Sequence, residues 1–137
     1  MEKEYETVGE VAKCKIQVVH YKDMIDGHKL NAVLFEFEAR LSYGSDTKSA
    51  VLDADEIDGL IASINIIKDK IIPTAAANYT EVNFKSRSGF MAGCFSKKEK
   101  WSTFLKLQSY DSNSYVWLEK DDFDKLLPIL QSAKAKL

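Results

Sequence analysis

The stretch Leu52–Ile71, LDADEIDGLIASINIIKDKI, decides the fold, because it returns later in the chain as Leu118–Leu137, LEKDDFDKLLPILQSAKAKL. The two segments align without gaps at an offset of 66 residues. The matching polar positions favour an internal repeat over two unrelated helices that agree by chance. Six positions are identical, namely Leu52/Leu118, Asp55/Asp121, Asp58/Asp124, Leu60/Leu126, Lys68/Lys134 and Lys70/Lys136.

Each copy has the pattern of an amphipathic helix. In the first copy, Asp53 with Glu56 three residues on predicts a capping box, and Pro73 ends the helix. The second helix runs from about Lys120 to Leu137, and Pro128 predicts a kink or a broken first turn. One apolar stripe recurs at helical spacing in the first copy: Ile57, Leu60, Ile61, Ile64, Ile67 and Ile71.

Period-two alternation predicts strands before each helix. Residues 1–10 form a polar start outside these strands. The fold class is therefore α+β, with two repeated units, each an antiparallel sheet of three or four strands followed by one helix. We expect one domain over 1–137, with units of about 8–72 and 78–137 and each helix packed on the sheet it follows. The predicted strands are Val11–Tyr21, Leu30–Leu41 and Lys48–Leu52, then Thr80–Lys85, Phe90–Ser96, Trp101–Gln108 and Tyr115–Leu118.

Composition is that of an ordinary globular protein of 137 residues, with 45% hydrophobic and 29% charged side chains. Residues 1–72 hold 9 basic and 14 acidic side chains, whereas residues 73–137 hold 10 and 7. We expect function to lie where the two copies diverge in charge. The sequence predicts no membrane span and no leader, hence a soluble chain, cytoplasmic by default and exported if a leader has been removed.

Candidate catalytic and metal-binding groups have structural explanations. Helix capping and the helix dipole account for the acidic run at 53–58, and the second copy repeats it. Cys14 and His20 share a strand face but lie about 20 Å apart along it. His28 belongs to a polar loop, and Cys14 and Cys94 are predicted to be buried thiols, with a disulfide as the alternative. We predict no catalytic residue, cofactor or metal.

The most suggestive surface lies in the middle of the second unit, where basic residues alternate with the aromatic residues Phe90, Phe95 and Phe104. Single-stranded nucleic acid needs charge for its phosphates and ring faces for stacking. The alternative is that the lysines serve solubility and the aromatics form core. The candidate ligand surface comprises Lys85, Arg87, Lys97, Lys98, Lys100, Trp101 and Lys106.

The order of elements resembles the single-stranded-DNA-binding Whirly family and the related positive transcriptional coactivators. That resemblance implies a repeated sheet-plus-helix unit and oligomers formed through the helices. The Lys-Gly-Lys strand motif of Whirly proteins is absent, so no functional residue is carried over. Residues Asn78–Glu81 and Arg87–Gly93 are also similar to bacterial proteins of uncharacterised function.

The sequence thus favours a non-enzymatic binding or interaction domain with an unknown partner. Two apolar helix stripes motivate the expectation that it self-associates as a homo-oligomer. The alternative is single-stranded nucleic-acid binding through the basic, aromatic surface. A third class, an enzyme with a shallow site between the two units, has the least support.

Overall fold

The N-terminal half forms a four-stranded antiparallel sheet, sheet A, in the computed structural model, which describes residues 1–137. A short 3₁₀ turn (Ala54–Glu56) then leads into α1 (Ile57–Ile66), which ends in a π-helical turn (Ile67–Ile71). The strands follow chain order across sheet A: β1 (Glu2–Val11), β2 (Cys14–Lys22), β3 (Lys29–Leu41) and β4 (Gly44–Asp53).

The C-terminal half repeats this order as sheet B and a second helix, α2 (Asp122–Ala135). The predicted α+β class, with an antiparallel sheet followed by a helix in each unit, is confirmed. Each sheet has four strands. Those of sheet B are β5 (Glu81–Lys85), β6 (Met91–Lys97), β7 (Lys100–Lys106) and β8 (Tyr115–Leu118).

The helix starts repeat at the level of single hydrogen bonds. The Asp53 N–H donates to Glu56 Oε1 at 3.2 Å, and the Glu119 N–H donates to Asp122 Oδ2 at 2.7 Å. These two pairs stand at the same 66-residue offset as the sequence repeat. The carboxylates are therefore used to satisfy backbone N–H groups at the start of each helix.

Each helix packs mainly against the sheet of the other unit. α1 lies against β5 and β6, and α2 lies against β1 and β2. A Cβ on Gly9 of β1 would come within 2.6 Å of Ile129 in α2, and one on Gly59 of α1 would lie 3.5 Å from the Phe84 ring in β5. The expectation that each helix covers the sheet it follows is wrong, because the two units exchange helices.

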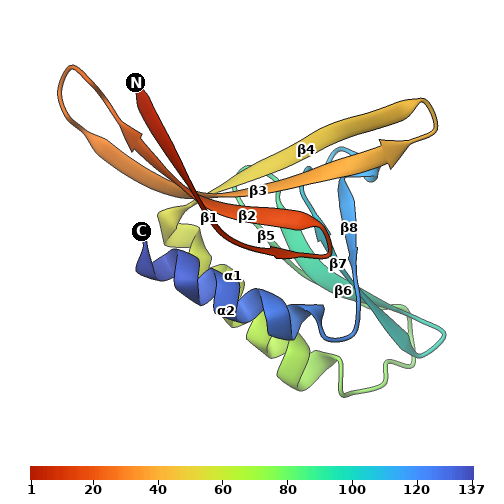
Figure 1. The fold of residues 1–137 in the computed structure, drawn as a ribbon. Coiled ribbons are helices and arrows are strands. Elements are labelled where there is room, and N and C mark those ends of the chain that lie inside the picture. The colour runs from red at the N-terminus through yellow and green to blue at the C-terminus, as the bar shows by residue number, and fades with distance from the viewer.

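The two helices lie side by side beneath the sheets (Figure 1). Lys68 Nζ pairs with Asp124 Oδ1 at 2.9 Å, and Lys134 Nζ pairs with Asp58 Oδ1 at 2.6 Å. The start of each helix is thus beside the end of the other, so the pair is antiparallel. The matching polar positions of the repeat form two equivalent ion pairs, one at each end.

A single cluster of 23 buried residues draws on both sheets and both helices. Within this cluster, Phe35 of the first unit and Phe90 of the second have ring centroids 4.5 Å apart. The apolar stripes of both helices belong to this cluster. The stripes are buried inside the chain, so they no longer support the expectation that the protein self-associates.

Two local predictions are wrong. The segment predicted as one strand over Val11–Tyr21 contains a two-residue turn at Ala12 and Lys13, whose φ angles are 50° and 65°, and the polar start is the strand β1. The broken first turn predicted at Pro128 is also wrong, because Asp122–Ala135 is one continuous helix, whereas the kink stays a prediction. Neither helix combines the length and the apolar character that a membrane crossing requires.

Candidate ligand-binding surface

Four aromatic side chains gather on the face of sheet B that points away from the helices. Strand register places Phe104 of β7 opposite Trp117 of β8, with Tyr115 on the same face two residues from Trp117. Phe95 of β6 pairs with Ser102, which shares the outward parity of Phe104. We call Phe95, Phe104, Tyr115 and Trp117 the ring platform.

The rings of the platform contact one another. Tyr115 and Trp117 are stacked, with centroids 4.7 Å apart and planes inclined by 8°. Phe104 lies 5.4 Å from Tyr115 and 6.2 Å from both Trp117 and Phe95. Trp117 is 56% exposed, whereas Phe104 is buried beneath its neighbours. The platform therefore exposes aromatic surface to solvent, and the buried ring of Phe104 supports that surface.

Gly93 allows the backbone of β5 to approach β6 closely next to the platform. It pairs with Phe104 on β7 and with Asn83 on β5. A Cβ on this residue would lie 2.3 Å from the carbonyl oxygen of Val82, a distance that real contacts do not reach. Any larger side chain would push β5 away from β6.

Lysines surround the platform. Lys106 Nζ lies over the Tyr115 ring at 4.7 Å from its centroid, a cation–π contact. Strand parity places Lys85, Lys97 and Lys100 on the same outer face, and the β6–β7 turn carries Lys98. None of these five lysines has an ion-pair partner in the chain. Their charges are available to an anionic ligand.

Arg87 belongs to a different group. Its guanidinium lies 2.6 Å from Asp55 Oδ1 and 2.9 Å from Asp53 Oδ2, and its backbone N–H donates to Glu56 at 2.9 Å. These hydrogen bonds raise the pKa of Arg87, with Asp55 the larger cause, and lower the pKa of Asp55. Arg87 thus ties the β5–β6 turn to the start of α1 and has its charge neutralised there.

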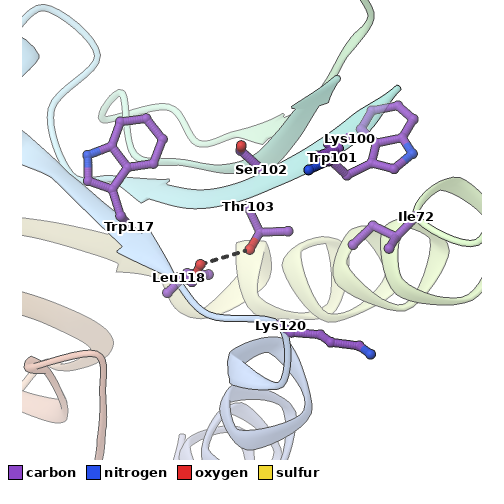
Figure 2. Close-up of a pocket in the computed structure, with 8 residues that line it drawn as sticks. All are labelled: Ile72, Lys100, Trp101, Ser102, Thr103, Trp117, Leu118 and Lys120. Atoms are coloured by element: carbon purple, nitrogen blue, oxygen red, sulfur yellow. Dashed lines mark hydrogen bonds between the residues drawn. The ribbon is translucent and has the colours of Figure 1, made fainter. Parts of the chain in front are cut away.

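Trp101 lies on the opposite face of β7 from the platform, because Lys100 and Ser102 have the outward parity. Its indole N–H donates to the Thr74 carbonyl at 2.9 Å. It lines a groove of about 910 Å³ at the edge of sheet B (Figure 2). The groove is lined by Ile72, Lys100, Trp101, Ser102, Thr103, Trp117, Leu118 and Lys120.

The seven residues selected from the sequence are therefore distributed over three places. Lys85, Lys97, Lys98, Lys100 and Lys106 surround the platform, Arg87 is ion-paired to the first helix start, and Trp101 is in the groove. Among the interleaved aromatics, Phe90 is core. Sequence reasoning missed Tyr115, Trp117 and Lys120. Alternation within Tyr115–Leu118 was the available signal, because it places Tyr115 and Trp117 on one face.

The remaining candidate groups are the two histidines and the two cysteines. His20 Nδ1 lies 2.8 Å from Asn31 Oδ1, and the backbone N–H of His28 donates to Asp26 Oδ1 at 2.7 Å within the loop. Cys14 and Cys94 are free and buried, as predicted. Burial is the first cause that raises the pKa of Cys14 to about 12 and that of Cys94 to about 11. Neither thiol is poised to form the reactive thiolate.

Comparison with protein-family models, with curated proteins and with solved structures returns no match.

Proposed function

We propose that this chain is a non-enzymatic binding protein and that the ring platform binds single-stranded nucleic acid. The observation that carries the proposal is the connected group of four rings on one open sheet face, surrounded by five lysines without ion-pair partners. Bases stack on aromatic rings whatever their identity, and lysines hold the phosphates. The expected ligand is a single strand, because the bases of a duplex are not free to stack on the platform.

Charge is consistent with this ligand. Few carboxylates lie near the platform. Asp111, which pairs with Lys48 at 2.7 Å, is also close enough to interact with the charge of Lys106. Glu81 stands on the outer face of β5 and accepts a hydrogen bond from the Tyr79 hydroxyl at 2.6 Å, and Glu99 belongs to the β6–β7 turn. The resemblance to Whirly proteins in element order adds support, and it stays a proposal.

The test is a titration of the protein with a fluorescently labelled single-stranded oligonucleotide at low and moderate salt. Binding should be strongest at low salt and should fall steeply as salt rises. Trp117→Ala should weaken binding at least fivefold, because a base stacked on an aromatic ring contributes about 1–3 kcal/mol. Lys106→Glu should weaken oligonucleotide binding more than Trp117→Ala does.

Tyr43→Ala is the matched control, because Tyr43 is a ring that is 84% exposed in the β3–β4 turn, outside sheet B. It should leave affinity unchanged. No binding at low salt would end the proposal. Equal effects of Trp117→Ala and Tyr43→Ala would also end it, because binding would then not use the platform.

Self-association stays a prediction, with a different candidate surface. With the helix stripes buried, the outer face of sheet A carries exposed apolar side chains, including Tyr5 at 53% and Leu30 at 55% exposure. Light scattering at high concentration should detect a dimer, and Leu30→Lys should disperse it. Ile25→Lys, at a loop residue that is 98% exposed, is the control. A monomer at every concentration would contradict the prediction.

A further inference from the structure

Strand β7 has an open edge over its first residues. β8 pairs only with Thr103–Lys106, although β7 begins at Lys100. After Leu118 the chain leaves the sheet and turns into α2. Residues 100–102 are therefore paired with β6 on one side and have no strand on the other. An open strand edge is a template for one more strand.

The register directs the main chain of Trp101 toward this open side. The β6–β7 hairpin has a two-residue turn, Lys98 and Glu99, with φ angles of 52° and 66°. In such a hairpin the closing pair, here Lys97 and Lys100, exchanges both main-chain hydrogen bonds. The next residue along β7, Trp101, then has its N–H and C=O directed away from β6. They are available to an added strand.

The groove beside this edge has apolar walls and two basic residues. Figure 2 shows Trp101 and Ile72 at one end and Trp117 at the other, with Lys120 below. The hydrogen bond from the Trp101 indole to Thr74 fixes the first wall before any ligand arrives. Neither Lys100 nor Lys120 has an ion-pair partner in the chain.

We infer that this groove binds an extended acidic peptide segment, which adds to the β7 edge as a further strand. The Trp101 main chain bonds the peptide backbone, the apolar walls take alternate side chains, and Lys100 and Lys120 take carboxylates. Added strands gain affinity from main-chain hydrogen bonds and specificity from pockets for alternate side chains. The groove shares Trp117 and Lys100 with the proposed nucleic-acid surface, whereas Trp101 and Lys120 lie outside the ring platform and belong to the groove alone.

Two other occupants fit the groove less well. A second copy that paired its own β7 edge here, with Trp101 opposite Trp101, would place Lys100 opposite Ser102 and supply no carboxylate for Lys100 or Lys120. A nucleic acid would supply phosphates for the lysines, but it has no alternating N–H and C=O groups to match the Trp101 main chain. An acidic peptide satisfies both the charges and the strand edge.

The test uses a labelled peptide in which aspartate alternates with leucine, and fluorescence anisotropy measures its binding to the intact protein. Two control peptides isolate the two interactions. One replaces aspartate by lysine, and the other keeps the side chains but carries N-methyl groups on alternate backbone nitrogens. We expect the unmodified peptide to bind and both controls to bind at least tenfold more weakly. Equal binding by either control would overturn the inference.

Variants locate the site. Lys120→Glu should weaken peptide binding about tenfold at low salt, whereas Lys29→Glu, at an exposed lysine at the start of β3, should not. Lys106→Glu should weaken the oligonucleotide and spare the peptide, so the two proposals fail separately. If an oligonucleotide displaced the peptide, and Lys120→Glu weakened the binding of both ligands equally, the groove would be assigned to nucleic acid. A dimer dispersed by Lys120→Glu would assign it to a second copy. Either result overturns the peptide site.

Discussion

Cys14 and Cys94 show how burial determines side-chain chemistry in this fold. Both thiols lie in the shared core, and desolvation raises their pKa values to about 12 and about 11. A raised thiol pKa means that the fold favours the protonated form. This contribution to stability is fully present below the unfolded thiol pKa of about 9 and is lost as the pH rises toward the folded values.

We predict that neither cysteine reacts with iodoacetamide in the native protein at about pH 8. Alkylation should become rapid in urea, because unfolding exposes both thiols and returns their pKa to the ordinary range. Mass spectrometry of samples quenched over time measures the number of modified thiols. Rapid modification of either residue under native conditions would contradict the burial described here.

The candidate surface could be predicted from the sequence only in part. Alternation alone is enough to place Lys106 and Phe104 on the same side of one strand. It also separates Trp101 from them, since odd and even positions of a strand face opposite ways. The contribution of Tyr115 and Trp117 depended on β8 pairing with β7, and nothing local to Tyr115–Leu118 specifies which strand is its neighbour.

At the scale of elements, the strand β1 was not predicted from the sequence, and the reason is local. Ala12–Val18 alternates between apolar and polar residues, and the turn at its start uses Ala12 and Lys13 instead of asparagine and glycine. Positive φ is uncommon at such residues, so no residue type marks the turn. The helices were predictable because their caps and apolar stripes are short-range features. Their exchange between units was not, because the two stripes are interchangeable.

The exchange of helices leads to a test of how the units depend on each other. We predict that cleavage at Ala76, in the linker after α1, gives two fragments that fold only when mixed. Alone, each fragment has a sheet whose apolar face lacks its covering helix. Circular dichroism with thermal melts of the fragments, separately and combined, measures this dependence.

The control is the intact chain carrying the same protease site, left uncut. It should melt at the temperature of the unmodified protein. If either fragment alone gave a cooperative melt with native-like near-ultraviolet signals, the exchanged packing would not be needed for stability.

At the scale of the whole molecule, most ion pairs join one unit to the other. Lys136 of the C-terminus pairs with Glu6 at 2.7 Å, and Lys48 pairs with Asp111 at 2.7 Å. The lysine partner is the largest cause that lowers the pKa of Glu6 and of Asp111. Arg87 does the same for Asp55. Three contacts between the units thus depend on ionised carboxylates.

We predict that acid weakens the association of the two units. A carboxylate whose pKa is lowered in the folded state stabilises the fold at pH values above its unfolded pKa of about 4. This stabilisation is lost as the pH falls through the folded pKa. The free energy of unfolding in urea should therefore be lower at about pH 3 than at about pH 6. Lys48→Met should reduce this difference, whereas Lys15→Met, at an exposed lysine without an ion-pair partner, should not. An unchanged difference in Lys48→Met would remove Asp111 from the explanation.

The exchanged helices also fix the order in which a newly made chain can fold. During synthesis, sheet A and α1 leave the ribosome first, but the helix that covers sheet A occupies Asp122–Ala135. Nearly the whole protein must be made before that sheet is covered, because the required contacts are distant in sequence. The first half therefore passes through a period with its apolar face open, in which chaperones could bind it and neighbouring nascent chains could pair with it.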